Sequence, residues 1–447
     1  MGKSILTAGA EPTSGALSDL SPLFGDAGLI RVGADLEMGG VPLARIAEKV
    51  GTPLYVYHAA VIRERYQALA TSFAAIPHKI CYAIKANSNL AVLRVLRDLG
   101  AGADIVSGGE MRRALKAGFP PERIVFSGVG KTGTELESAV EAGLGHVHLE
   151  SVAEMEELAD IARARGARVG VGIRVNPDVT AKTHPFIATG QGAVKFGVPY
   201  DQVVDLAAAI ARQPSLELDT IAMHLGSQLL DPAPYRQGLE RLLALVDRIA
   251  AAGIDTVRYL DIGGGLGIRY RDETALEPAL VAAAVIPLLR DRGLTVVLEP
   301  GRFLVGSSGV LLTQVLSRKH SGGKDLVIVD AGMNDLVRPS HYGAFHAITE
   351  LRAQGRPPLR MDVVGPVCET GDFLALDREL PGLERGDLLA VLGAGAYGFV
   401  MSSTYNTRPR PAEVIVDAGR WAVVRPRIRD DEIFAAESVE PAWETQG

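Results

Sequence analysis

Apolar, β-branched runs alternate with amphipathic stretches through the middle of the chain. Eight runs have the composition of strands: Lys79–Lys85, Ala103–Ser107, Ile124–Gly128, His146–Glu150, Val169–Val175, Thr220–Leu225, Val257–Ile262 and Thr295–Glu299. Between the first five runs, apolar residues recur at the spacing of one helix face, in Asn89–Leu99, Glu110–Ala117, Gly133–Ala142 and Ser151–Arg165. Strands that alternate with helices predict an α/β fold with a parallel sheet and right-handed crossovers.

The number of strand–helix units favours a closed sheet. Eight units over roughly 220 residues fit a (β/α)8 barrel of the TIM type, for which about 250 residues is typical. A doubly wound open sheet is the alternative that the pattern leaves open.

The pattern changes after residue 306, where short β-rich segments are separated by Pro and Gly. The segments are Val310–Ser317, Leu326–Asp330, Met361–Val364, Phe373–Leu376, Leu388–Leu392, Glu413–Val416 and Trp421–Val424. They predict a mostly antiparallel β domain, with one helix-like piece around Ala344–Arg352. We therefore expect residues 58–305 to form the barrel and 306–447 the β domain, with 1–57 as an N-terminal segment packed on the β domain.

Composition narrows the functional classes. The chain has 447 residues and a formal net charge of −7, which argues against a nucleic-acid partner. It has no run of eighteen apolar residues, so we expect no membrane span, and residues 1–13 lack the apolar region of a secretory signal. Cys81 and Cys368 are the only cysteines, which fits a reducing cytoplasm. His and Cys lack the spacing of a metal site, and we expect no metal.

The predicted ends of the barrel strands carry the residues that suggest chemistry, since active sites of such barrels lie there. Lys85 ends the first strand, where a buried ammonium needs a partner or a Schiff base with a carbonyl cofactor. Glu299 ends the eighth strand, and a buried carboxylate there needs a cation such as the protonated pyridine nitrogen of pyridoxal 5'-phosphate (PLP). A solvated lysine and a structural ion pair between Glu299 and Arg302 are the alternatives.

Two further strand ends support a phosphate-bearing cofactor. Gly263, Gly264 and Gly265 follow the seventh strand, where these barrels often bind phosphate and where consecutive backbone N–H groups can surround an anion. A tight turn is the alternative. His224 and Ser227 follow the sixth strand, where the imidazole could stack on a flat ring and the hydroxyl could bind phosphate. Each signal is weak alone, and together they favour PLP.

A second glycine-rich segment is a misleading one. Residues 393–398 have the spacing G-x-G-x-x-G after a strand, but the following segment, 402–409, is a poor helix former. A dinucleotide site needs a helix at this place, so we do not expect a nicotinamide cofactor.

From about residue 50 to residue 427 the chain resembles diaminopimelate decarboxylase, of the alanine-racemase-like (fold type III) PLP enzymes. The general motifs are residues 82–87 (YAIKAN), 224–227 (HLGS), 263–265 (GGG) and 299–302 (EPGR). The more specific motifs are 174–177 (RVNP), 184–190 (HPFIATG), 195–197 (KFG), 333–339 (MNDLVRP) and 368–372 (CETGD). Ser340-His341 and Thr404 depart from the residues usual in that family.

The resemblance implies a decarboxylation of meso-diaminopimelate to L-lysine and carbon dioxide, with a role for each of these residues. Lys85 would bind PLP, His224 would stack on its ring, and Glu299 would pair with its pyridine nitrogen. The phosphate would be held by Ser227, Gly263, Gly264, Gly265, Gly301, Arg302 and Tyr397. Cys368 would deliver the proton. The distal end of the amino-acid substrate would be bound by Arg302, Arg338, Tyr342, Glu369 and Tyr397, and a homodimer would share its active sites across the interface.

The substrate's charges agree with this residue set. A distal carboxylate suits arginine, which binds it in a bidentate fashion, and a distal ammonium suits Glu369. Ornithine lacks a distal carboxylate and would leave buried arginines unpaired. A decarboxylase of ornithine, lysine, arginine or carboxynorspermidine, a racemase and a non-catalytic PLP-binding protein remain as alternatives. An interdomain ion pair is the structural alternative for Arg338.

Overall fold

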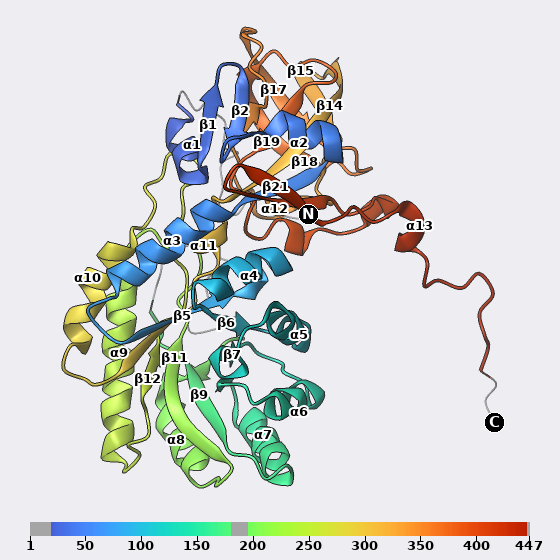
Figure 1. The fold of residues 1–447 in the computed structure, drawn as a ribbon. Coiled ribbons are helices and arrows are strands. Elements are labelled where there is room, and N and C mark those ends of the chain that lie inside the picture. The colour runs from blue at the N-terminus through green and yellow to red at the C-terminus, as the bar shows by residue number, and fades with distance from the viewer. Residues whose placement is uncertain (1–18, 180–194, 445–447) are drawn as a thin grey trace, which may run out of the picture. The chain divides into compact units, whose positions relative to one another are not determined.

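A computed structural model describes residues 19–179 and 195–444, which belong to two compact units (Figure 1). The barrel unit comprises residues 58–308 and 395–400. The β unit comprises the described residues up to 57, together with 309–394 and those from 401 onward. The segment 395–400 thus belongs to the barrel unit, although in sequence it comes almost 100 residues after the last barrel strand, which ends at Leu298.

Eight parallel strands close into a barrel, so the closed-barrel prediction is confirmed over the open sheet. In spatial order from β5 the strands follow the chain, and β8 pairs with β9 to close the ring, with Val147 opposite Val171. The short strand β10 (Val198–Pro199) pairs outside the ring with β9. The eight strands are β5 (His78–Ala83), β6 (Gly102–Ile105), β7 (Ile124–Phe126), β8 (His146–Leu149), β9 (Val169–Asn176), β11 (Leu216–Met223), β12 (Tyr259–Asp261) and β13 (Thr295–Leu298).

Helices lie outside the strands, and side-chain caps set where four of them begin (Figure 1). Asn89, Ser107, Thr132 and Ser151 each accept a hydrogen bond from a backbone N–H in the first turn of the following helix. Among the described residues, no helix is long and apolar enough to cross a membrane. The helices of the barrel unit are α3 (Ala59–Ser72), α4 (Leu90–Asp98), α5 (Gly108–Ala117), α6 (Gly133–Ala142), α7 (Val152–Ala164), α8 (Val203–Ala211), α9 (Ala233–Ala251), α10 (Pro278–Leu289) and α11 (Arg302–Val305).

The β unit is organised around one long strand, β14 (Gly309–Ser321), which pairs antiparallel with β4, β15 and β19. One neighbouring pair, β15 with β17, is parallel, so the predicted domain is antiparallel in most but not all of its pairs. The remaining strands are β4 (Leu54–His58), β15 (Lys324–Val329), β16 (Ile348–Glu350), β17 (Pro358–Val364), β18 (Phe373–Pro381), β19 (Leu388–Val391), β20 (Ala412–Asp417) and β21 (Arg420–Arg425). Two short helices lie in the C-terminal part of the unit, α12 (Arg338–Tyr342) and α13 (Asp430–Ile433).

The N-terminal region, whose first 50 residues carry little sequence signal, contributes directly to the core of the β unit. Leu36, Leu43, Ile46 and Val56 are buried together with Val310 and residues of β19 and β20. Apolar burial of this kind is the main stabilising term in folding. The elements before β4 are α1 (Ser21–Ala27), β1 (Leu29–Val32), β2 (Asp35–Met38), β3 (Val41–Pro42) and α2 (Leu43–Val50).

The helix expected around Ala344–Arg352 is wrong. The structure has strand β16 there, paired with β19 so that Ile348 lies opposite Val391. All residues from 345 to 351 are buried, so this piece has no solvent-exposed face of the kind that a surface helix has. The β-branched side chains of Ile348 and Thr349 also favour an extended backbone.

Candidate active site

Lys85 lies directly after β5, in the short 3-10 helix Ile84–Ala86, and faces an acidic residue of the next strand. Its Nζ is 2.9 Å from Oδ2 of Asp104, whose side chain is fully buried. Burial opposes the charge on Lys85, but Asp104 and then Glu299 outweigh it and raise the pKa of Lys85 above its ordinary value. The lysine is therefore held as an ammonium group at the carboxyl end of the strand.

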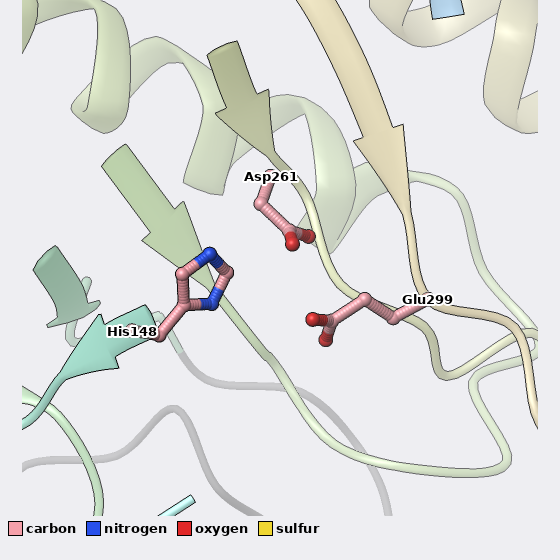
Figure 2. A group of neighbouring side chains, drawn as sticks. All are labelled: His148, Asp261 and Glu299. Carbon is pink, nitrogen blue, oxygen red and sulfur yellow. The ribbon is translucent and has the colours of Figure 1, made fainter. Parts of the chain in front are cut away.

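Three polar side chains from different strands meet inside the barrel. Figure 2 shows His148 of β8, Asp261 at the end of β12 and Glu299 directly after β13 pointing toward one another. Their ligand-type atoms lie within 4.8 Å of one another, and all three residues are buried. The expected absence of a metal remains a prediction here.

The two acids in this group favour the protonated state. Burial, reinforced by Asp104, raises the pKa of Glu299 to about 7. Burial and then the Glu299 carboxyl raise the pKa of Asp261 well above its ordinary value. Asp261 Oδ1 accepts a hydrogen bond of 2.7 Å from the backbone N–H of Gly263, which leads into the glycine-rich loop. A cation placed beside Glu299 would reverse this balance, because it favours the ionised carboxylate.

His224 follows β11, and its ring orientation is defined by the glycine-rich loop. The backbone N–H of Gly264 donates to His224 Nδ1 at 3.2 Å, so Nδ1 acts as an acceptor. Burial, followed by Lys85 and Arg174, holds the pKa of His224 well below its ordinary value. A neutral imidazole in this position can stack on a planar ring without adding charge.

The loop Gly263–Gly265 can be built only from glycine. Gly263 and Gly265 have φ angles of +72° and +104°. A Cβ atom on Gly264 would lie 2.1 Å from the backbone oxygen of Glu299, and one on Gly265 would lie 2.5 Å from that of Gly226. The backbone therefore passes very close to its neighbours, and the N–H groups of Gly263 and Gly264 donate to Asp261 Oδ1 and His224 Nδ1.

Arg302 organises the polar groups at the start of α11. Its guanidinium donates to Ser227 Oγ at 3.0 Å and to Tyr270 Oη at 2.7 Å. It also lies 4.8 Å from the centre of the Tyr397 ring. Tyr397 belongs to the segment 395–400, and its backbone N–H donates to the Ala86 oxygen beside Lys85. The predicted phosphate ligands Ser227 and Tyr397 thus both contact Arg302, and Gly301 immediately precedes it.

A cavity of about 340 Å³ opens beside Lys85, and its described lining does not include Ser227, Arg302, Tyr397 or the glycine-rich loop. Lys85, His224 and Glu299 line it, together with three residues that the sequence did not single out as ligands: Ser127, His148 and Arg174. Asp104 and Asp261 were also missed. All five are polar residues within or directly after barrel strands, and that position was the signal in the sequence.

The remaining predicted residues belong to the β unit. Arg338 is buried at the start of α12 and donates from Nη1 to His346 Nε2 at 2.9 Å. His346 in turn donates from Nδ1 to the backbone oxygen of Leu392, which fixes its tautomer. Tyr342 ends the same helix, and its ring packs edge-on against His341 at 4.5 Å.

Cys368 and Glu369 are exposed on the loop between β17 and β18. Asn406 Oδ1 accepts the Cys368 backbone N–H at 2.8 Å, and Glu369 hydrogen-bonds to Tyr405, which raises the pKa of that phenol. Asp372 accepts the backbone N–H of Val367, so the loop is tied down on both sides of the cysteine.

Two further sequence motifs lie at 393–398 and 184–190. The segment 393–398 is followed by a three-residue 3-10 helix, Phe399–Met401, and not by the α-helix that a dinucleotide site needs. The whole motif at 184–190 lies within residues 180–194, outside the described residues.

Comparison with known proteins agrees with this geometry. Residues 59–306 match the family model "Pyridoxal-dependent decarboxylase, pyridoxal binding domain". The chain is 51% identical to a diaminopimelate decarboxylase of Pseudomonas aeruginosa, over 91% of this chain and 98% of the relative. It is 48% identical to the Aquifex aeolicus diaminopimelate decarboxylase, over 89% and 94% of the two chains. A crystal structure of diaminopimelate decarboxylase from Helicobacter pylori complexed with L-lysine superposes with a TM-score of 0.86 at 39% identity, covering 88% of this chain and 99% of that one.

The buried Glu299 makes the stability of the cofactor-free protein depend on pH. Its folded pKa of about 7 exceeds the value of roughly 4.3 expected in the unfolded chain, so the protonated form stabilises the fold and stability is lost as pH rises through 7. Glu299→Gln removes that penalty. We expect the variant to gain up to about 3 kcal/mol relative to the parent between pH 5 and pH 8.5.

Thermal unfolding of both cofactor-free proteins at the two pH values measures this gain. Glu64→Gln, at an exposed position on α3, is the matched control and should follow the parent at both. If the stability difference between Glu299→Gln and the parent is the same at pH 5 and pH 8.5, the carboxyl of Glu299 does not have a raised pKa.

Proposed function

Because this chain belongs to the diaminopimelate decarboxylases of the pyridoxal-dependent decarboxylase family, we propose that it converts meso-diaminopimelate into L-lysine and carbon dioxide. The reaction is the last step of lysine biosynthesis. The single observation that carries the proposal beyond the family is the cavity that has the Lys85 ammonium and the buried Glu299 carboxyl on its walls.

The residues of this cavity fit PLP. An amine and an acid line the same cavity, and the glycine-rich loop follows β12, where the missing Cβ atoms let its backbone pass close to Glu299 and Gly226. We infer that Lys85 holds the aldehyde carbon, that His224 lies against the ring and that Glu299 pairs with the pyridine nitrogen. Ser227, the backbone of Gly263–Gly265, Gly301, Arg302 and Tyr397 would hold the phosphate. Bound PLP supplies an electron sink for the carbanion that remains when carbon dioxide leaves.

The chain's own residues prepare each part of that chemistry. Asp104 holds the Lys85 ammonium in place until the lysine gives up a proton to react. Burial raises the pKa of Glu299 to about 7, so a cation beside the carboxyl would favour its ionised form. His224 is neutral and so does not compete with the pyridine nitrogen for the Glu299 charge.

The β unit supplies groups that suit the rest of the substrate. Cys368 is an exposed thiol, and we propose that it delivers the proton that replaces the carboxyl group. Arg338, with Arg302 and Tyr342, would bind the distal carboxylate, and Glu369 would bind the distal ammonium. His346 accepts the Arg338 hydrogen bond with Nε2, the ring nitrogen that carries no proton. The contact is therefore with an uncharged group and does not neutralise the guanidinium charge.

We further propose a homodimer in which Cys368 and Glu369 complete the site of a second copy. Support comes from their place on an exposed loop, where both side chains are accessible to another chain. A two-fold dimer would then carry two equivalent composite sites. A cytoplasmic location is also a proposal, and it rests on the two cysteines, which are both free thiols.

A direct assay tests the function. Purified protein with PLP and meso-diaminopimelate should release L-lysine and carbon dioxide in equal amounts, whereas L-ornithine and L-lysine should be turned over far more slowly because they lack the distal carboxylate. Borohydride reduction should label Lys85, and Lys85→Ala should abolish both the label and the product. Ornithine turnover at the diaminopimelate rate would favour the alternative decarboxylases instead.

Arg338→Ala should lower kcat/KM for diaminopimelate, because it removes a charge-assisted contact to a buried anion. The loss should correspond to roughly 2–5 kcal/mol of transition-state stabilisation, while PLP binding stays unchanged. Arg378 is the matched control, because it is also buried and also contacts His346, through the backbone oxygen. Arg378→Ala should lower the melting temperature without changing the preference for diaminopimelate over ornithine. If both variants change that preference equally, Arg338 has no specific role in recognition.

Mixing two inactive variants tests the shared site. Lys85→Ala and Cys368→Ala should each be nearly inactive alone. After subunit exchange, half of the dimers are mixed and each has one intact site of two, so activity should approach about a quarter of the parent value. Demonstrated exchange without any recovery of activity would mean that Cys368 serves its own chain.

A further inference from the structure

A buried hydrogen-bond chain lies behind Glu299. Ser127 directly follows β7, and its Oγ donates to Glu299 Oε1 at 3.2 Å. His148 Nδ1 lies 3.3 Å from the same Ser127 Oγ. The three residues are at most 6% exposed, and all three line the cavity wall. Figure 2 shows the His148 ring and the Glu299 carboxyl on facing strands of this group.

The chemistry of the partners fixes the direction of the chain. With PLP bound, Glu299 would be ionised and could only accept, so the single Ser127 hydroxyl hydrogen would point at Glu299. Ser127 Oγ must then accept from His148, which places the imidazole hydrogen on Nδ1. Burial, followed by His146, Lys131 and Arg174, holds the pKa of His148 well below its ordinary value. The imidazole is thus neutral and adds direction to the carboxyl group without adding charge.

Surrounding contacts hold the His148 ring in this orientation. Lys131 donates from Nζ to the His148 backbone oxygen at 2.6 Å and pairs with Glu154 at the same distance. On the other side lies Gly172 of β9, where a Cβ atom would come within 2.5 Å of His148 Cδ2. The absence of a side chain on Gly172 therefore leaves the space that the His148 ring occupies.

We propose that Ser127 and His148 are positioning residues that orient the Glu299 carboxyl toward the pyridine nitrogen of PLP. The proposal rests on the function proposed above, in which Glu299 is the partner of that nitrogen. Ser127 occupies Oε1 and fixes the rotation of the carboxyl group, and His148 fixes Ser127. Loss of either one should leave Glu299 present but misdirected.

A purely structural role is the competing explanation, and strand β8 offers a matched comparison. His146 lies two residues before His148, so the two side chains point to the same face of the strand. It is also buried, and its Nδ1 pairs with Asp219 at 3.1 Å. His146 has no contact with Glu299 among the described residues, and it does not line the cavity.

The test uses full-length His148→Leu, His148→Asn and Ser127→Ala, with His146→Leu as control. The readouts are the dissociation constant of PLP, the absorption spectrum of the bound cofactor as a function of pH, and the melting temperature. We expect His148→Leu and Ser127→Ala to weaken PLP binding about 5- to 10-fold, the effect of one buried hydrogen bond, and to shift the pH at which the spectrum changes.

Asparagine should rescue the site, because its side-chain NH2 can replace the Nδ1 hydrogen, so His148→Asn should bind PLP within about threefold of the parent. The double variant Ser127→Ala/His148→Leu should bind PLP as tightly as Ser127→Ala alone, because His148 acts on Glu299 only through Ser127. His146→Leu should lower the melting temperature and leave binding and spectrum unchanged.

Three results would overturn the inference, and they differ in what else they remove. If Glu299→Gln binds PLP with the parent's affinity and spectrum, the proposed role of Glu299 is wrong and the positioning role is lost with it. If Glu299→Gln is impaired but His148→Leu and Ser127→Ala match the parent, only the positioning role is wrong. Failure of His148→Asn to rescue a weakened His148→Leu would also reduce His148 to a structural residue.

Discussion

Burial of acidic groups around one lysine is the constraint on which the barrel site depends. Asp104, Asp261 and Glu299 are all at most 6% exposed, and an unpaired buried carboxylate costs several kcal/mol. The barrel meets this cost in three ways. Lys85 neutralises Asp104, the Gly263 backbone hydrogen-bonds to Asp261, and protonation removes the remaining charge. A cationic ring beside Glu299, as proposed for PLP, would favour the ionised carboxylate in place of the protonated one.

The β unit follows the opposite principle. Cys368, the proposed proton donor, and Glu369, the proposed ammonium partner, lie on an exposed loop. Arg338, which precedes them in sequence, is buried and hydrogen-bonded to His346. Asp372 and Asn406 hold the loop through backbone N–H groups, which leaves the Cys368 and Glu369 side chains unconstrained by those contacts. The conformation of the loop is thus set by hydrogen bonds to its backbone, and its reactive side chains are exposed.

The sequence predicted the repeating architecture better than the partners within it. All eight barrel strands follow from apolar periodicity, and Lys85, His224, the triple glycine and Glu299 follow from their positions at strand ends. Ser127 and Glu299 are 172 residues apart, and only the closure of the barrel makes them neighbours. The strand at 348–350 was mistaken for a helix because its burial on all sides cannot be read from a short apolar run. Tyr397 was expected to bind phosphate from the resemblance alone, since nothing local connects its segment with the barrel.

Strand β4 has a consequence for how the chain is made. Leu54 pairs with Leu312 and Val56 with Val310, so a strand near the start of the chain hydrogen-bonds to one that leaves the ribosome more than 250 residues later. At the usual synthesis rates of about 5–20 residues per second, the wholly buried strand Leu54–His58 remains without this partner for roughly 13 to 50 seconds. During that interval its bare edge is a site for wrong pairing with another nascent chain. The barrel, whose strands all lie between these two partners, can close first and shorten the search that β4 must make.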